Sequence, residues 1–540
     1  MGQSKVRIRS FVCLILFCIG MCSCQTGKYG VRIEEDLVNT NVIEDNYRNY
    51  YEIFVRSFYD SDGDGIGDLQ GIIEKLDYID DLGFNGIWLM PIHPSDSYHK
   101  YDVNDYFAVD PSYGTMDDLE ELIEECHKRN IRIILDLVLN HTGINHPSFN
   151  KSASIHQKYL NGQSLTEEEE RWHDYYSFYD TKEDIPGNVG YQKVAGRDFY
   201  YECNFSSSMP ELNLDNSLVQ EDIQKIIDFY LDKGIDGFRL DAVKYYYMGS
   251  TAKNVEFLAK LNSWAKQKNP DAYIVGECWD SAQVIEEYYQ SGCDSFFNFP
   301  GSISSPNGFI MNSINRDGAA LGSYFDGMLA NIEMASNCIP APFIDNHDTP
   351  RFTSAGDVRK TKFQYALLQM LNGTTFTYYG DEVGLFGTNA GSANKDENVR
   401  IPIRWGKDGT GDCSMLSGIT GSQYPYPTVA EQMEDRASIY HFYKKVLLIR
   451  NQNPEIARGS VSLIEMEKET KKELFIAKEY GGKRIGIIFN FSPTEDLNVA
   501  YQTEGFTQVV GQIVVDQDKY IGMQKDNSIL LPPYSIAIVK

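Results

Sequence analysis

The sequence predicts an α/β protein whose main domain is a (β/α)8 TIM barrel, and three observations indicate this. From about residue 50 to 450, short apolar runs alternate with segments in which apolar residues recur at helical spacing. Eight such runs can be counted, each with a crossover segment. Polar residues gather where several runs end, which is where such a barrel carries its functional groups. A doubly wound sheet is the alternative, weakened because no GxGxxG follows the first run.

The eight apolar runs are the expected strands, because continuous apolar runs suit strands that are covered on both faces. In order they are YEIFVRSFY (51–59), GFNGIWLMPI (83–92), IRIILDLVLNH (131–141), GIDGFRLDAV (234–243), AYIVGECW (272–279), SFFNFP (295–300), APFIDNHD (341–348) and TTFTYYGDE (374–382). Helical periodicity predicts helices over 68–83, 115–130, 221–234, 253–269 and 436–454. Thr115 is the expected N-cap of the second.

The barrel is interrupted once and is followed by a second kind of domain. Residues 142–214 are polar, aromatic and irregular, so we expect an inserted domain after strand three, with the barrel formed by 45–141 and 215–455. Residues 456–540 read as a small antiparallel β-sandwich. Its signals are a hairpin around Gly481 and Gly482 and a second strand pair in NSILLPPYSIAIVK.

The first residues resemble a bacterial lipoprotein signal. Lys5, Arg7 and Arg9 precede the apolar stretch FVCLILFCIGM, which is too short to span a bilayer as a mature helix. Ser23 and Cys24 follow, so we expect a signal peptide over 1–24 ending at a lipidated Cys24; an ordinary cleaved signal is the alternative. The predicted location is outside the cytoplasm, lipid-anchored at the bacterial outer membrane on its periplasmic or cell-surface face.

Composition excludes some functions. The formal charge of −28 argues against a nucleic-acid partner, which needs a basic surface, and suits a neutral substrate. Six cysteines lie beyond the signal segment without CxxC pairing, so a structural zinc site is not expected and buried thiols are. We expect a monomer that meets a membrane only through its lipid anchor.

Charged residues at the strand ends point to glycoside hydrolysis. Asp241 and Glu277 end strands four and five. Two carboxylates facing each other about 5–5.5 Å apart can supply a nucleophile and a general acid/base. Arg239 lies two residues before Asp241, on the same strand face, and favours the ionised form, so Asp241 is the expected nucleophile and Glu277 the acid/base. A structural ion pair between Arg239 and Asp241 is the alternative.

Four blocks resemble the α-amylase family, glycoside hydrolase family 13: DLVLNH (136–141), GFRLDAVKY (237–245), VGECWD (275–280) and FIDNHD (343–348). The resemblance implies a barrel with a domain B after strand three and a β-sandwich domain C. It implies Asp241 as nucleophile, Glu277 as acid/base and Asp348 as the third carboxylate, which holds sugar hydroxyls. Residues implied to bind the sugar are His99, Tyr101, which stacks beneath it, His141, Arg239 and His347.

Departures from the family pattern bear on specificity. Lys100 stands where the motif often has Gly, and Lys244-Tyr245 where it often has Lys-His; Lys244 is still implied to bind sugar beyond the cleavage point. MPELN (209–213) resembles the MPDLN form of members between oligo-1,6-glucosidases and neopullulanases, including bacterial α-amylases.

We therefore expect a retaining, endo-acting hydrolase of the α-1,4 bonds of starch or maltooligosaccharides, working through a covalent glycosyl-enzyme intermediate. Exo-acting α-glucosidase, oligo-1,6-glucosidase and glucanotransferase activities are alternatives. An inactive starch-binding protein is the alternative of another class, disfavoured because all three carboxylates are present.

The stretch DSDGDGIGD (60–68) predicts a structural Ca²⁺ site. An EF-hand is excluded because its twelfth position would be Gly71, which has no ligand, and because a strand precedes the loop. The stretch resembles the calcium loop after strand one in related α-amylases, with side-chain ligands from Asp60, Asp62, Asp64 and Asp68 and the carbonyl of Ile66. In α-amylases the equivalent of Asn140 often joins a second calcium, for which no partners can be named.

Overall fold

The computed structural model describes residues 28–35, 37, 43–305, 308–315, 318–334, 338–353, 357–388, 396–417, 419, 424–466 and 472–540. The predicted signal segment 1–24, with Cys24, lies outside these residues. Within them, no helix is both long enough and apolar enough to cross a membrane.

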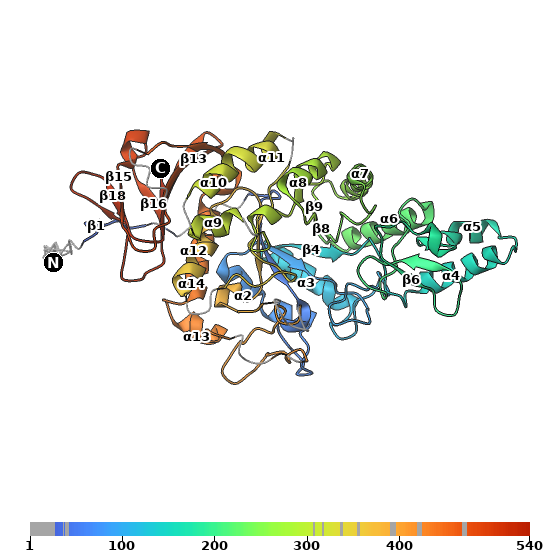
Figure 1. Cartoon of the computed structure of the whole chain (residues 1–540). Coiled ribbons are helices and arrows are strands. Elements are labelled where there is room, and N and C mark those ends of the chain that lie inside the picture. Colours follow the sequence, from blue (N-terminus) through green and yellow to red (C-terminus); the bar gives the residue numbers. More distant parts are fainter. Residues whose placement is uncertain are drawn as a thin grey trace, which may run out of the picture.

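A curled, fully parallel sheet of seven strands forms the centre of the molecule (Figure 1). Its order is β10-β9-β8-β4-β3-β2-β11. The strands are β2 (Asn49–Ile53), β3 (Gly86–Leu89), β4 (Arg132–Leu137), β8 (Gly237–Leu240), β9 (Tyr273–Gly276), β10 (Ser295–Phe296) and β11 (Thr375–Tyr378). All of their residues except Arg132 are buried, as expected for a sheet covered on both faces.

The seventh strand position of the barrel, counted along the chain, is filled by an extended segment instead of a regular strand. The backbone N–H of Asn298 donates to Ala341 O at 3.0 Å on one side, and that of Phe376 donates to Pro342 O at 3.1 Å on the other. The segment therefore lies between β10 and β11 and closes the ring. The predicted strand 341–348 is irregular because Pro340 and Pro342 have no N–H to donate to a ladder.

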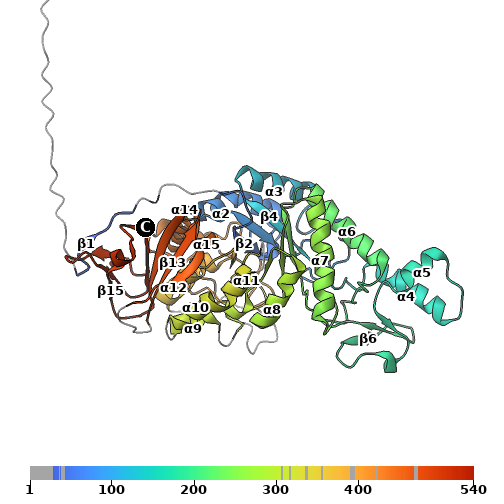
Figure 2. The same cartoon turned by 90° about the horizontal axis from the view of Figure 1, so that it is seen from above.

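Helices surround the sheet (Figure 1, Figure 2). They include α3 (Met116–Lys128), α6 (Ser217–Asp232), α7 (Thr251–Lys268), α8 (Ala282–Tyr288), α9 (Phe309–Asn315), α10 (Ala319–Tyr324), α11 (Ala330–Met334), α12 (Val358–Gln369), α13 (Val429–Glu434), α14 (Ile439–Gln452) and α15 (Glu455–Arg458). Thr115 caps α3 in a reciprocal capping box with Asp118, which confirms the predicted start.

The helix predicted over 68–83 is wrong in one respect, since it is two helices, α1 (Leu69–Glu74) and α2 (Leu76–Leu82). Lys75 leaves the helical conformation between them, and its N–H bonds Ile72 O, three residues back. Its ammonium group lies 3.9 Å from the centre of the Tyr59 ring. The apolar spacing continues through the break, so periodicity alone does not reveal it.

The inserted segment forms a small unit at one end of the molecule (Figure 1, Figure 2). It contains α4 (Pro147–Leu160), α5 (Glu167–His173) and a three-stranded antiparallel sheet, ordered β5-β7-β6. These strands are β5 (Phe178–Tyr179), β6 (Tyr191–Lys193) and β7 (Tyr200–Glu202). The unit rests on the loop after β4, where Leu212 N donates to Asn140 O at 3.0 Å.

Two antiparallel sheets form the opposite end of the molecule (Figure 1). One contains β12 (Ser460–Leu463), β13 (Glu473–Tyr480), β14 (Lys483–Asn490), β19 (Ser535–Val539) and β16 (Val509–Val514). The other contains β1 (Val31–Arg32), β17 (Gly522–Met523), β18 (Ile529–Leu531) and β15 (Leu497–Val499). The first residues of the described chain thus complete a sheet made by the last ones, which was not expected.

The two sequence signals in this region have different outcomes. Gly481 and Gly482, at φ +59° and +73°, connect β13 to β14 in a two-residue hairpin, which confirms the prediction. The predicted pair within 527–540 is wrong, because β18 and β19 belong to different sheets. The proline pair between them, Pro532 and Pro533, cannot continue a ladder, so the chain crosses from one sheet to the other.

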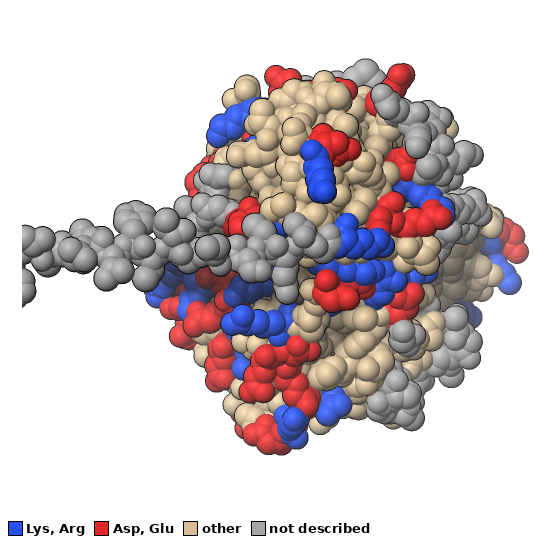
Figure 3. Space-filling view, turned by 90° about the vertical axis from the view of Figure 1, so that its left-hand side faces the viewer, with Lys and Arg blue, Asp and Glu red and all other residues tan. Residues whose placement is uncertain are grey.

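The surface of this end carries both signs of charge. In Figure 3, Lys and Arg side chains lie among Asp and Glu side chains over the middle and lower parts of the face seen from this end of the molecule. The excess of 77 acidic over 49 basic residues is therefore not gathered into one acidic patch on this face.

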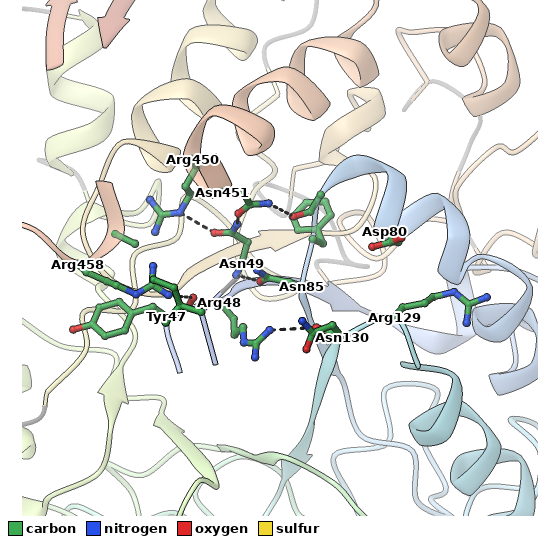
Figure 4. Close-up of a pocket in the computed structure, with 14 residues that line it drawn as sticks. Tyr47, Arg48, Asn49, Asp80, Asn85, Arg129, Asn130, Arg450, Asn451 and Arg458 are labelled. Carbon is green, nitrogen blue, oxygen red and sulfur yellow. Dashed lines mark hydrogen bonds between the residues drawn. The ribbon is translucent and has the colours of Figure 1, made fainter. Parts of the chain in front are cut away.

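A polar cavity of about 150 Å³ lies at the N-terminal ends of the strands (Figure 4). The buried Arg450 lines it and donates to the carbonyl oxygens of Gln369, Leu371 and Gly373 at 2.6–2.7 Å. It also donates to Asn49 Oδ1 at 2.8 Å, at the start of β2. Arg450 therefore supplies hydrogen-bond donors to carbonyl oxygens that have no intrahelical partner at the C-terminal end of α12. These contacts stabilise the N-terminal end of the barrel, opposite the end that carries the functional residues.

Candidate active site

The C-terminal ends of the central strands bring seven of the nine predicted catalytic and sugar-binding residues into one open cavity of about 630 Å³, while Arg239 and His347 lie buried beneath it and do not line it. In the register of the sheet, Asp136 of β4 lies opposite Arg239 of β8, and Arg239 lies opposite Val275 of β9. The chain therefore delivers Asp241 and Glu277 just beyond neighbouring strands. The predicted residues that line the cavity are His99, Tyr101, His141, Asp241, Lys244, Glu277 and Asp348.

Arg239 is the central cation of this group and is fully buried. Its Nη1 lies 2.7 Å from Asp241 Oδ1 and 2.9 Å from Asp136 Oδ1, and its Nη2 lies 3.2 Å from Glu277 Oε2. Asp136 and Asp241 both contact Nη1, and Glu277 contacts Nη2. The ion pair considered as the structural alternative is therefore present within the same cluster as the two candidate catalytic carboxylates. A single arginine fixes Asp241 and Glu277 relative to each other.

The surroundings of Glu277 favour its protonated form. Burial raises the pKa of Glu277 to about 7; Arg239 opposes this rise, and the charges of Asp241 and Asp348 add to it. Glu277 Oε2 also accepts the N–H of Ala242 at 2.9 Å. Near neutral pH, Glu277 thus keeps a proton that it can donate, as a general acid requires.

His347 links the third carboxylate to the first strand. Its Nδ1 lies 2.5 Å from Glu52 Oε1, and its Nε2 lies 3.1 Å from Asp348 Oδ2. Burial disfavours the charged ring, but the carboxylates of Asp348 and Glu52 outweigh it and raise the pKa of His347 to about 9. The imidazolium and Arg400, 2.7 Å from Asp348 Oδ1, hold the pKa of Asp348 well below its usual range despite burial.

Tyr101, the residue predicted to stack beneath the sugar, is hydrogen-bonded to Asp136 and contacts His347. Its hydroxyl donates to Asp136 Oδ2 at 2.9 Å and lies 2.7 Å from His347 Nε2. The Tyr101 and His347 rings are stacked with centroids 5.5 Å apart. His141 Nε2 donates to the carbonyl oxygen of Tyr101 at 3.1 Å, and burial lowers the pKa of His141. Burial and then Arg400 lower the pKa of His99 to about 4, so both imidazoles are neutral at pH 7.

Lys244 lies at the rim of the cavity. Its Nζ is 2.7 Å from Asp280 Oδ2 and donates to Trp279 O at 3.3 Å. Trp279 is 43% exposed and stacks on Phe299 with centroids 4.8 Å apart, so one ring face is held and the other is open. Phe205 and Tyr245, 4.7 Å apart, also line the cavity. Aromatic faces of this kind suit the apolar faces of sugars.

Sequence reasoning missed several of these residues. Glu52 is hidden within an apolar run, and Arg400 lies outside all four family blocks, so no local pattern pointed to either. Phe205 was hidden by the abundance of tyrosine and phenylalanine in this chain, whereas Trp279, one of five tryptophans, lies within the block VGECWD and could have been singled out. Arg400 is 52 positions from its partner Asp348, and Glu52 is 295 positions from its partner His347.

The acidic loop before α1 holds a group of carboxylates that could bind a metal. Asp60, Asp62 and Asp68 each offer an oxygen within 4.8 Å of the others. Asp64, also a predicted ligand, is not in this group; its Oδ1 accepts the N–H of Ile66 at 2.7 Å. A set of carboxylate oxygens is the donor type that Ca²⁺ prefers, so the residues present fit this ion.

Asn140 shows no comparable set. Its Nδ2 donates to Glu211 Oε2, and Asn204 N donates to Glu211 Oε1 at 3.0 Å. Burial raises the pKa of Glu211 to about 8, so this carboxyl is largely protonated at neutral pH. Among the residues that the structure describes, the only cluster of three or more potential metal ligands is that of the acidic loop. A second calcium at Asn140 therefore gains no support.

A barrel whose strand ends carry two carboxylates on one arginine, beside an aromatic platform, defines a carbohydrate-cleaving enzyme class. Residues 52–459 match the family described as alpha amylase, catalytic domain. This chain belongs to that family, glycoside hydrolase family 13, as the four sequence blocks implied.

Individual relatives carry more than one activity in their names. Alpha-amylase 3 of Dictyoglomus thermophilum is 37% identical over 503 residues, covering 92% of this chain and 93% of that protein. The solved structure of Eubacterium rectale Amy13B has a TM-score of 0.86 at 40% identity and covers 93% of this chain and 97% of that one. An oligo-1,6-glucosidase of Bacillus cereus is 27% identical over 82% of this chain and 90% of its own length.

Proposed function

We propose that this protein is a retaining, endo-acting α-glucan hydrolase that cleaves α-1,4 bonds of starch and maltooligosaccharides. The observation that carries the proposal is the placing of Asp241 and Glu277 on opposite nitrogens of Arg239, 2.7 and 3.2 Å away. Family membership gives α-glucans as the substrate class.

The electrostatics support a division of labour. Asp241 contacts the guanidinium at the mouth of the barrel, where an ionised carboxylate can attack the anomeric carbon. Glu277 holds a proton near neutral pH and can pass it to the leaving oxygen, and as a carboxylate it can then activate a water or a second sugar. Asp348, kept ionised by His347 and Arg400, can accept hydrogen bonds from sugar hydroxyls.

Endo action is supported by the aromatic rim. Trp279 and Tyr245 line the cavity together with Lys244, so sugar units beyond the cleaved bond have surfaces to stack on. The 37% identical relative named alpha-amylase agrees with α-1,4 cleavage. α-1,6 cleavage is the alternative suggested by the names of several more distant relatives, which are 27–29% identical.

The first experiment is reducing-sugar release from amylose by the wild type and by Asp241→Asn. We expect release by the wild type and a loss of at least 10⁴-fold in the variant. A wild type as inactive as the variant would leave the starch-binding alternative. Product lengths from soluble starch, isomaltose and pullulan then separate the hydrolases, since glucose as the sole product would contradict endo action.

Two further parts of the proposal concern the ion and the location. Ca²⁺ would be held by Asp60, Asp62 and Asp68, where its charge would offset their repulsion and fasten the start of α1. The resemblance of residues 1–24 to a lipoprotein signal supports export and anchoring through Cys24 at the outer membrane. Mass spectrometry of the mature N-terminus would show or exclude the lipid.

A further inference from the structure

Lys100 occupies an unusual conformation between two residues of the sugar cavity. Its φ is +66°, which lies in the left-handed region that residues other than glycine rarely adopt. Its neighbours His99 and Tyr101 both line the cavity, whereas Lys100 does not. Something must hold the turn in this conformation, since the lysine backbone does not favour it.

The side chain of Lys100 is held by a buried ion pair. Its Nζ lies 2.7 Å from Asp110 Oδ2, with the two side chains only 11% and 9% exposed. The ammonium also lies 5.5 Å from the centre of the Tyr113 ring. A buried pair of this kind gains strength from the low local polarity, and removing one partner strands the other charge.

Asp110 is a fixed anchor for this pair. Its Oδ1 accepts both the N–H and the hydroxyl of Ser112, at 3.0 and 2.5 Å, and its own N–H donates to Ile92 O at 2.8 Å. Ser112 and Lys100 hold the pKa of Asp110 low although burial would raise it. Tyr113 O, in turn, accepts the N–H of Leu69 at the start of α1, at 3.0 Å. The anchor is thus tied to the barrel.

We propose that Lys100 is a positioning residue for sugar binding, and that its buried ion pair with Asp110 holds the His99–Tyr101 turn against the cavity. The inference rests on the proposed function, because it assigns a sugar to these two residues. A glycine would adopt this backbone without strain but could not tie the turn to Asp110. Lysine at position 100 gives up the backbone freedom of glycine but connects the turn to Asp110 through its side chain.

The test compares variants that break and keep the pair. Lys100→Met combined with Asp110→Asn removes both charges without stranding either, and Lys100→Gly relaxes the backbone but removes the tether. We expect kcat/KM on maltooligosaccharides to fall about tenfold or more in both, with a matching rise in the inhibition constant of maltotriose. Lys100→Arg should stay within about twofold of the wild type, because it keeps a cation for Asp110.

The matched control breaks an exposed pair, Lys193 with Asp198, which are 2.8 Å apart and 51% and 98% exposed. Lys193→Met with Asp198→Asn should leave both constants unchanged. If the buried double variant does not fold, Asp110→Asn alone, which keeps an oxygen acceptor, should still lower kcat/KM about threefold.

A folded Lys100 double variant or Lys100→Gly with wild-type kcat/KM and maltotriose inhibition would overturn the proposal. So would wild-type constants in a folded Asp110→Asn. A wild type that releases no reducing sugar would instead refute the proposed function, so the two failures are distinguishable.

Discussion

Glu277→Gln gives the sharpest test of the proposed division of labour. The pKa of Glu277 lies near 7 instead of its ordinary 4.5, a preference for the protonated form of about 3 kcal/mol. Glutamine has the same shape but cannot release a proton. With amylose, whose leaving group is a poor alkoxide, we expect the rate to fall about 10²–10⁴-fold.

The assay uses two substrates that differ in their need for an acid. A 4-nitrophenyl maltooligosaccharide releases nitrophenolate, which leaves without protonation, so Glu277→Gln should form the glycosyl-enzyme quickly and show a burst of colour. Turnover should then stall, because the second step needs Glu277 as a base. Asp241→Asn is the control and should give no burst, since it lacks the nucleophile.

The pH profile completes this prediction. The wild-type rate on amylose should fall as pH rises through about 7, because only the protonated fraction of Glu277 can donate. The first step of Glu277→Gln should lack this decline. If the variant loses both substrates equally and shows no burst, Glu277 is not the acid and the assignment is refuted.

Three other predictions can be checked directly. Chelation of the wild type should lower Tm, and Ca²⁺ should restore it; Asp62→Asn should weaken this response, and an equal Tm with and without chelator would contradict the site. Trp279→Ala should raise KM for long maltooligosaccharides about tenfold while sparing short ones, and an unchanged chain-length dependence would contradict the platform. Gly237→Ala should lower the free energy of unfolding by about 3 kcal/mol in denaturant titrations, because its Cβ would lie 2.0 Å from Tyr273 O; unaltered stability would contradict this packing.

The fold could be predicted because its signals are local. Apolar runs and helical spacing occur within ten to twenty residues, and the turn at Gly481 and Gly482 depends on two. The seventh strand was predicted at the correct place in the chain, but the structure has an irregular segment there. Pro340 and Pro342 lack N–H groups; their carbonyls accept the N–H groups of Thr374 and Phe376 on one side, and Ala341 O accepts that of Asn298 on the other. The strand pair expected in 527–540 failed because pairing depends on partners elsewhere in the chain.

Within the candidate active site, the residues that could be predicted from the sequence are those that lie in the four family blocks. Asp241, Glu277 and Asp348 follow from their blocks, but what gives them their properties does not. Glu52 acts on His347 across the barrel, and Arg400 reaches Asp348 from a loop without a recognisable motif. Such contacts between distant segments produce no periodic or local pattern in the sequence. The catalytic residues can therefore be identified from motifs, whereas the residues that set their protonation states cannot.

Strand β1 has a consequence for how the chain is made. Gln524 Nε2 donates to Tyr29 O, and these residues are 495 positions apart. Val31 and Arg32 leave the ribosome early, yet their partners Met523 and Gly522 are among the last residues translated. The first strand must therefore wait unpaired through nearly the whole of synthesis, and closing this longest contact is a late step of folding. A chain that stops before residue 522 would leave that strand without its partner.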